Sequence, residues 1–148
     1  MSTILVADDS STFREPIAAS LRLRGHQVVV ADNGQAAIES LEEQLVDLAV
    51  IDVCMPQLNG VELLERMRAQ KLLDDVPVIV LTSLAQHEVI GLDRLGDCSY
   101  FSKSDFSFEQ LSAAVDEALE RLRLRGASFR ARRSATASSR RRGASESR

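Results

Sequence analysis

Short apolar runs alternate with longer segments of helical spacing along the first 125 residues of the chain. The runs are rich in β-branched residues and largely apolar on both faces, as central strands of a parallel sheet are when helices cover both sides. The pattern therefore predicts five strands. Their sequences are TILVAD (3–8), QVVVAD (27–32), LAVID (48–52), PVIVLT (77–82) and CSYFS (98–102).

The segments between these runs carry apolar residues three or four positions apart, which is typical of amphipathic helices. They span 12–25, 34–45, 60–71 and 108–125. Gly25 is a typical residue to end the first helix, and Pro16 is expected in its first turn, where proline is tolerated. The candidate N-cap residues are Asn33, Asn59 and Ser107. A further segment, 85–95, contains Gly91 and predicts a short, weaker helix.

Strands and helices in this order, joined by right-handed crossovers, predict an α/β fold with an open, doubly wound parallel sheet and helices on both faces. Such sheets bind ligands outside the carboxyl ends of their strands. We therefore expect three carboxylates, a hydroxyl and an ammonium to meet at one edge of the sheet. The residues at these strand ends are Asp8, Asp9, Asp52, Thr82 and Lys103.

Taken singly, each of these residues has an ordinary structural explanation. A lone Asp at a strand end is more often a turn residue or a helix cap, and a lone Thr or Lys carries almost no information. Their joint occurrence at one edge favours a functional site. Three carboxylate oxygens with a few waters form an oxygen site that suits Mg²⁺, and one of the acids could attack phosphorus to form an aspartyl phosphate.

Composition and cysteine spacing limit the class of protein. The chain has 148 residues, of which 45% are hydrophobic, enough for one domain with a single core and too few for a second effector domain. Cys54 and Cys98 lie far apart without a metal-type or redox-type spacing, which suits a reducing compartment. The apolar run ILVA is cut off by two acids, so we expect neither a signal peptide nor membrane insertion, and a cytoplasmic location.

The charge is distributed unevenly along the chain. Residues 1–120 hold 8 basic and 21 acidic side chains, a net charge of −13, whereas residues 121–148 hold 10 basic and 1 acidic, a net charge of +9. From 126 to 148 the composition is dominated by Arg, Ser and Ala, without apolar periodicity. We therefore expect a folded domain over 1–125 and a disordered basic tail over 126–148.

Four motifs carry a resemblance to a known family. They are ADDS (7–10), VIDVCMPQLNG (50–60), VIVLTS (78–83) and YFSK (100–103). In these motifs the chain resembles the receiver domains of bacterial two-component response regulators, and it is similar to the stand-alone chemotaxis response regulator. The resemblance covers the whole predicted domain, and it implies a flavodoxin-like sheet with strand order 2-1-3-4-5.

The resemblance also implies a role for each strand-end residue. It makes Asp52 the phosphoacceptor and places Mg²⁺ on Asp8, Asp9 and Asp52 and on the backbone carbonyl of Cys54. Lys103 and Thr82 would contact the phosphoryl group. By the same resemblance, the phosphate donor is a histidine kinase or a phosphotransfer protein, and the chain is a self-phosphorylating acceptor that also dephosphorylates itself, not a turnover enzyme.

A two-state switch follows from the same resemblance. Phosphorylation of Asp52 would draw the Thr82 hydroxyl inward, and the Tyr100 ring would fill the vacated space. The surface formed by the segments 85–95, 98–102 and 108–125 would then change its preference for an unidentified downstream protein. We expect a monomer, with phosphorylation-dependent dimerisation as the other option.

The chain departs from the family at two places. The family usually follows the lysine with a proline in a cis peptide, whereas Ser104 follows Lys103 here, and a non-proline cis bond costs about 2.5–4 kcal/mol. The second departure concerns Cys54 and Leu84, which occupy positions that influence hydrolysis of the phosphoryl group in the family. Neither orients water well, so we expect a long-lived phosphoryl state.

Other functions remain open at this point. The Arg-rich tail could bind nucleic acid or another polyanion without sequence preference, could lie on the acidic domain, or could be a solvated extension. A phosphohydrolase of the haloacid dehalogenase type is disfavoured, because Cys54 stands where those enzymes need a second acid and Asp52 ends the third strand. His26 and His87 lack the surroundings of a phosphodonor, and we expect both to be surface residues.

Overall fold

The computed structural model describes residues 2–70, 73, 75–83, 98–105 and 107–125. The helix predicted over 85–95, with His87, lies outside the described residues, as do Leu84 and the segment 126–148. Within the described part of the chain, no helix is long and apolar enough to cross a membrane.

Five parallel strands form one sheet, and each coincides with a predicted run to within one residue. The strands are β1 (Thr3–Ala7), β2 (Gln27–Ala31), β3 (Leu48–Asp52), β4 (Val78–Thr82) and β5 (Cys98–Ser102). Their order in the sheet is β2-β1-β3-β4-β5, with every neighbouring pair parallel. The predicted doubly wound α/β fold and strand order are confirmed, and every strand ends at the same edge of the sheet.

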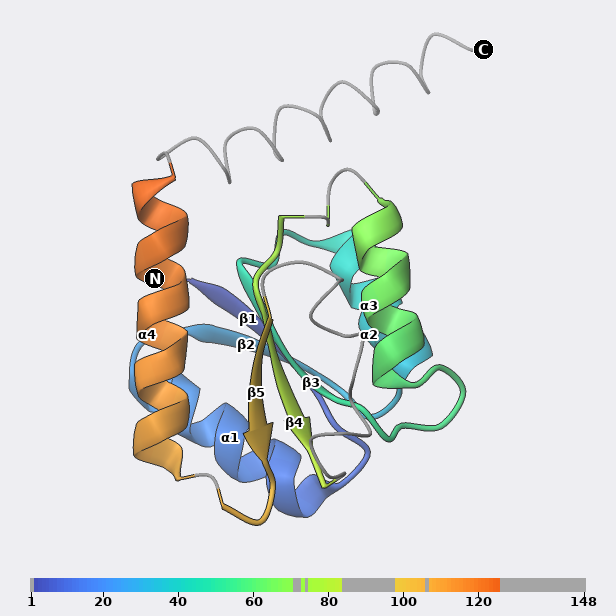
Figure 1. Ribbon diagram of the computed structural model, residues 1–148, viewed down its shortest axis with the longest axis horizontal. Coiled ribbons are helices and arrows are strands. Elements are labelled where there is room, and N and C mark those ends of the chain that lie inside the picture. The colour runs from blue at the N-terminus through green and yellow to red at the C-terminus, as the bar shows by residue number, and fades with distance from the viewer. Residues whose placement is uncertain (1, 71–72, 74, 84–97, 106, 126–148) are drawn as a thin grey trace, which may run out of the picture.

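Within the described residues, four helices cover the two faces of this sheet (Figure 1). In Figure 1, α1 and α4 lie on one side of the strands, and α2 and α3 lie on the other. Each helix begins and ends within two residues of its predicted range. The helices are α1 (Ser11–Leu23), α2 (Gly34–Glu43), α3 (Gly60–Ala69) and α4 (Phe108–Leu124).

Two apolar clusters, one on each face, hold the layers together. Along β4, Val78 and Val80 pack with residues of α2 and α3, while Ile79 and Leu81 pack with residues of α1 and α4. Successive side chains of a strand point to opposite faces, so a strand covered on both sides is apolar at every position. This explains why β1, β3 and β4 are continuous apolar runs with polar residues only at their ends.

The helix ends follow the predicted capping chemistry. The side chains of Asn33, Asn59 and Ser107 each accept a hydrogen bond from a backbone N–H in the first turn of α2, α3 and α4, respectively. At the C-terminus of α1, Gly25 has φ +94° and donates its N–H to the Arg22 carbonyl, as a glycine after a helix typically does.

The position predicted for Pro16 is wrong. Helix α1 begins at Ser11, so Pro16 is its sixth residue and belongs to the second turn. Proline there removes the N–H that would bond to the carbonyl of Thr12. Both residues are exposed, so water can donate to that carbonyl.

Candidate functional site

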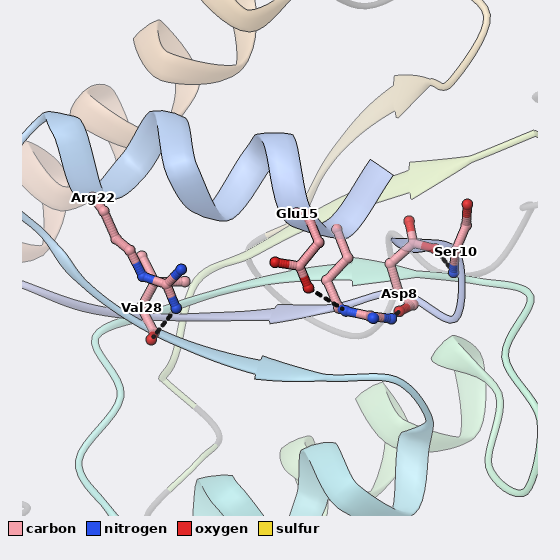
Figure 2. Close-up of polar contacts among 6 residues, drawn as sticks. Asp8, Ser10, Glu15, Arg22 and Val28 are labelled. Carbon is pink, nitrogen blue, oxygen red and sulfur yellow. Dashed lines mark hydrogen bonds and ion pairs between the residues drawn. The ribbon is translucent and has the colours of Figure 1, made fainter. Parts of the chain in front are cut away.

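Asp8 and Asp9 follow β1 directly, where the chain turns into α1. The N–H of Asp8 still donates to the Ala31 carbonyl of β2 (3.0 Å), which continues the ladder one residue beyond the strand. The Oδ1 atom of Asp8 accepts the N–H of Ser10 (2.9 Å), and Figure 2 shows these two residues together at the turn. Asp8 is buried and Asp9 is exposed, so the pair spans the boundary between core and solvent.

Asp52 is the last residue of β3 and is also buried. The N–H of Cys54 donates to its Oδ1 atom (3.2 Å), which orients the carboxylate toward the edge of the sheet. Cys54 itself is exposed.

The three carboxylates among the four predicted metal ligands come together in space. Asp8, Asp9 and Asp52 each offer a carboxylate oxygen, and these atoms all lie within 4.8 Å of one another. Hard oxygen donors of this kind suit Mg²⁺, which also retains several waters when it is bound to proteins. The donor set therefore fits a magnesium ion, and the ion would offset the repulsion among the acids.

Lys103 follows β5 and points its ammonium into the same cluster. Its Nζ lies 2.8 Å from Oδ2 of Asp8 and 3.3 Å from Oδ2 of Asp52, and its side chain is only 10% exposed. The backbone N–H of Lys103 donates to the Thr82 carbonyl (2.9 Å), which fastens the residue to the end of β4. The ammonium also lies over the Phe13 ring, 4.5 Å from its centroid.

The turn after Lys103 is not built on a cis peptide. None of the peptide bonds that the structure describes is cis, so the bond between Lys103 and Ser104 is trans. The hydroxyls of Ser102 and Ser104 are hydrogen-bonded to each other (2.8 Å), and the N–H of Asp105 donates to the Ser102 carbonyl (3.2 Å). These bonds close the turn without the proline that the family usually has.

Burial and neighbouring charges both shift the pKa values of Asp52 and Lys103. Burial first, and then the Asp8 carboxylate, raise the pKa of Asp52 to about 6, although Lys103 opposes the shift. Burial by itself would lower the pKa of Lys103, but its contacts with Asp8 and Asp52 outweigh that effect and raise it. Without a metal, Lys103 therefore keeps its proton, and ionising the Asp52 carboxyl costs free energy.

Thr82 and Tyr100 lie on the same face of the sheet. Thr82 ends β4 and is buried, and it pairs with Ser102 in the ladder. Tyr100 pairs with Val80, which is two residues before Thr82 and belongs to the cluster under α2 and α3. The half-buried Tyr100 ring packs against this cluster, so the hydroxyl and the ring share one layer, as the switch hypothesis requires.

The loop between β3 and α3 is held close to Asp52. Gln57 has φ +67°, and the N–H of Leu58 donates to the carbonyl of Pro56 (2.7 Å) across it. Such a three-residue turn is rare and strained. Gly60 then donates its N–H to the Val53 carbonyl (2.8 Å), and a Cβ on Gly60 would lie 2.4 Å from the Asp52 carbonyl oxygen. Only glycine allows this approach.

Sequence reasoning missed two neighbours of the site. Phe13 lies at an apolar position of the helix predicted over 12–25, and nothing in the helical pattern indicates that its ring meets an ammonium. Arg14 donates from Nη1 to the Asp8 carbonyl (2.8 Å) and also contacts Glu15, so its guanidinium holds the turn after β1. The spacing of apolar residues in a helix gives no sign that Phe13 contacts Lys103 or that Arg14 contacts Asp8.

Comparison with known proteins agrees with this fold. The model of the response regulator receiver domain family matches residues 4–116. The chain belongs to this family.

Relatives and solved structures show how far the similarity extends. Response regulator MprA of Mycobacterium ulcerans is 37% identical over 123 residues, which cover 82% of this chain and 51% of that protein. The chain therefore spans about half the length of the curated relatives it matches. The receiver domain of Francisella response regulator 1452 is 30% identical with a TM-score of 0.75, covering 82% of this chain and 99% of that one.

A further solved structure contains a metal. Response regulator TrrA of Thermotoga maritima, in complex with Mg²⁺ and BeF, is 29% identical with a TM-score of 0.71, covering 80% of this chain and 99% of that one. Receiver domains bind Mg²⁺ at an acidic site and are signalling domains, not turnover enzymes. In this chain, Asp8, Asp9 and Asp52 form a cluster of carboxylate oxygens that could hold such an ion.

Proposed function

We propose that this receiver domain is a phosphorylation-dependent switch that accepts a phosphoryl group on Asp52. The observation that carries the proposal is the arrangement of three carboxylates within 4.8 Å, with the Lys103 ammonium bridging two of them. The donor would be a phosphohistidine of a histidine kinase or of a phosphotransfer protein, and the receiver of the signal a downstream protein.

In the transfer, a carboxylate oxygen of Asp52 forms a bond to phosphorus. The phosphorus–nitrogen bond of the donor breaks at the same time, and the leaving imidazole takes up a proton from solvent. Asp8, Asp9, Asp52 and the Cys54 carbonyl would hold Mg²⁺, which when bound neutralises charge on the acids and on the phosphoryl oxygens. Lys103 would exchange its contact with Asp52 for a phosphoryl oxygen.

The same proposal assigns the switch to Thr82 and Tyr100. The Thr82 hydroxyl would move toward the phosphoryl group, and the Tyr100 ring would turn inward into the space that it leaves. Support comes from their shared layer on one face of the sheet. The responding surface would be formed by β5 and α4 together with the segment 85–95, and dimerisation on phosphorylation would use this surface too.

The proposal is tested by phosphoryl incorporation from acetyl phosphate, followed on a phosphate-affinity gel. We expect labelling of the wild-type protein that requires Mg²⁺ and is lost in Asp52→Asn. Asp32→Asn is the matched control, because Asp32 is an exposed acid at the end of β2, outside the cluster, and this variant should label normally. Labelling of Asp52→Asn, or wild-type labelling without Mg²⁺, would contradict the assignment.

A chase of the labelled protein measures the lifetime of the phosphoryl group. The exposed Cys54 offers no group that orients a hydrolytic water well, so slow loss of label is expected, and rapid hydrolysis in Mg²⁺ would refute that expectation.

Binding of a polyanion is a second candidate function. It is favoured by the net charge of +9 over residues 121–148, next to a domain of opposite charge. Several arginines in one short segment release counterions from nucleic acid and so supply affinity without sequence preference. In this case the receiver would regulate the availability of the basic segment.

A further inference from the structure

Among the residues that the structure describes, three side chains lie at the Lys103 ammonium, and one of them is uncharged. Two are the carboxylates of Asp8 and Asp52, at 2.8 and 3.3 Å. The third is the Phe13 ring, whose centroid lies 4.5 Å from Nζ. An ammonium at this distance from a ring face is attracted to the negative charge of the π-system, and the attraction grows when water is excluded.

The two carboxylates are partners that the chemistry takes away. A divalent cation on the acidic cluster would compete with Lys103 for the oxygens of Asp8 and Asp52, and a phosphoryl group would be bonded to one of the Asp52 oxygens. The ring binds neither the cation nor the phosphoryl group. It is therefore the one side-chain partner among these three that Lys103 keeps throughout the reaction.

We propose that Phe13 is a positioning residue that holds the Lys103 ammonium at the site while its carboxylate partners are occupied by the metal and the phosphoryl group. This inference rests on the proposed function, because it assigns a task to Phe13 within phosphoryl transfer. It goes beyond that function in naming a residue that touches neither the metal nor the phosphorus.

The position of the ring is itself well determined. The N–H of Phe13 donates to the Ser10 carbonyl (3.2 Å) in the first turn of α1, immediately after the turn that carries Asp8 and Asp9. Its half-buried side chain packs against the cluster that contains Ile17 and Leu21. Asp8, Asp9 and the Phe13 ring thus lie on one short segment, the turn after β1 and the first turn of α1. A contact with the ring therefore keeps the ammonium close to these two acids.

The backbone around Lys103 makes such a contact useful. Its main chain is fastened by the N–H bond to Thr82, and the following peptide is trans. The long, flexible lysine side chain has several rotamers, and ordering it costs conformational entropy. A ring beneath the ammonium limits those rotamers before the phosphoryl group arrives.

The test compares Phe13→Leu with Phe13→Tyr and with Phe101→Leu as the matched control. Leucine keeps apolar volume but removes the ring, tyrosine keeps the ring, and Phe101 packs half-buried against the same cluster from β5. At saturating Mg²⁺ we expect Phe13→Leu to lower the labelling rate with acetyl phosphate by about three- to thirty-fold. The labelling rates of Phe13→Tyr and Phe101→Leu should stay within about two-fold of the wild-type rate. The Mg²⁺ affinity of Phe13→Leu should also stay within about two-fold of the wild-type affinity.

A second readout does not depend on phosphorylation. In the metal-free protein, the ring should shield the ε-methylene protons of Lys103, giving an upfield NMR shift that persists in Phe13→Tyr and disappears in Phe13→Leu. Absence of that shift in the wild-type protein would overturn the inference, whatever the labelling shows.

The remaining outcomes separate the two proposals. If wild type is labelled and Phe13→Leu is labelled at the same rate, the inference about Phe13 fails and the proposed function stands. If Phe13→Leu loses Mg²⁺ affinity as much as labelling rate, Phe13 supports the metal turn and the positioning role is wrong. If wild type takes no label, the proposed function fails and this inference fails with it, even where the NMR contact is present.

Discussion

At Asp52, burial and the neighbouring Asp8 carboxylate both disfavour the ionised form, and the Lys103 ammonium offsets them only in part, so that the pKa is raised. Asp52 is only 3% exposed, and a second buried carboxylate, Asp8, shares its single ammonium partner. Removing a charged group from water is costly unless opposite charge compensates it. Two buried carboxylates against one ammonium leave a surplus of negative charge, which a divalent cation would offset.

Replacing Asp52 with asparagine should stabilise the metal-free protein at neutral pH. The pKa of Asp52 is raised from 3.8 to about 6, so between these values the folded state binds a proton that the unfolded state lacks. The ionised carboxyl therefore destabilises the fold above pH 6 and ceases to do so as the pH falls toward 4. Urea unfolding with EDTA should show Asp52→Asn more stable than wild type by about 1–3 kcal/mol at pH 7, and by less at pH 4.5.

Asp32→Asn is the control for this pH dependence, because Asp32 is exposed and should leave the stability nearly unchanged at both pH values. An Asp52→Asn advantage that grows as the pH is lowered would contradict the sign of the shift.

At the scale of elements, the approach of α3 to the end of β3 sets the position of Asp52. Gly60 begins α3 and lies against the Asp52 backbone, where an added Cβ would meet the carbonyl oxygen at 2.4 Å and the Cα of Val53 at 2.8 Å. Neither atom belongs to a flexible side chain, so the strand or the helix has to shift.

Gly60→Ala should therefore lower both stability and phosphorylation. Overpacking of this kind costs about 1–3 kcal/mol in the free energy of unfolding, and the displaced Asp52 should accept phosphate more slowly. The measurements are urea unfolding and the rate of labelling by acetyl phosphate.

Asn59→Ala is the matched control one residue away. It removes the cap hydrogen bond to the N–H of Glu62 (2.9 Å) and should cost about 1 kcal/mol, but it places no atom near Asp52. Its labelling rate should stay close to that of wild type. Equal loss of labelling in both variants would show that stability, and not the position of Asp52, determines the rate.

The elements were predictable because local chemistry specifies them. Each strand is an apolar run ended by a polar residue, and Asn33, Asn59 and Ser107 cap their helices as expected. The register of α1 was predicted less well, since the helix starts one residue earlier than its apolar pattern and places Pro16 in the second turn. The left-handed backbone of Gln57 has no sequence signal, because glycine is the residue that usually marks such a conformation.

For the whole molecule, the uneven charge leads to a prediction of its own. The 148-residue chain should bind double-stranded DNA of arbitrary sequence at low salt, and its affinity should fall steeply as salt increases. Replacing Arg140, Arg141 and Arg142 with serine should lower the slope of log affinity against log salt by about 2–3. The measurement is fluorescence anisotropy of labelled DNA at several salt concentrations.

An equal change of charge within the folded domain serves as the control. The control residues are exposed: Arg22 lies in α1, Arg24 directly follows α1, and Arg66 lies in α3. Their replacement with serine should change the slope much less. Equal effects of the two triple variants would mean that net charge, not the basic segment, sets the affinity. Absence of binding at low salt would rule out the polyanion function.

The sequence by itself determined the order of elements, the parallel sheet and the residues at the strand ends. Apolar periodicity, caps and strand-end acids act over a few neighbouring positions, so they can be read from the chain without knowing what packs where. Because all parallel strands end at one edge, even the meeting of Asp8, Asp52 and Lys103 followed from topology.

Only the tertiary structure decided the contacts between those residues and their surroundings. Two such contacts are the Phe13 ring under the Lys103 ammonium and the fit of Gly60 against Asp52, each of which brings separate parts of the chain together at atomic distances. Such contacts depend on how helices and strands pack, and the energies that select them come from burial, charge and steric fit in three dimensions.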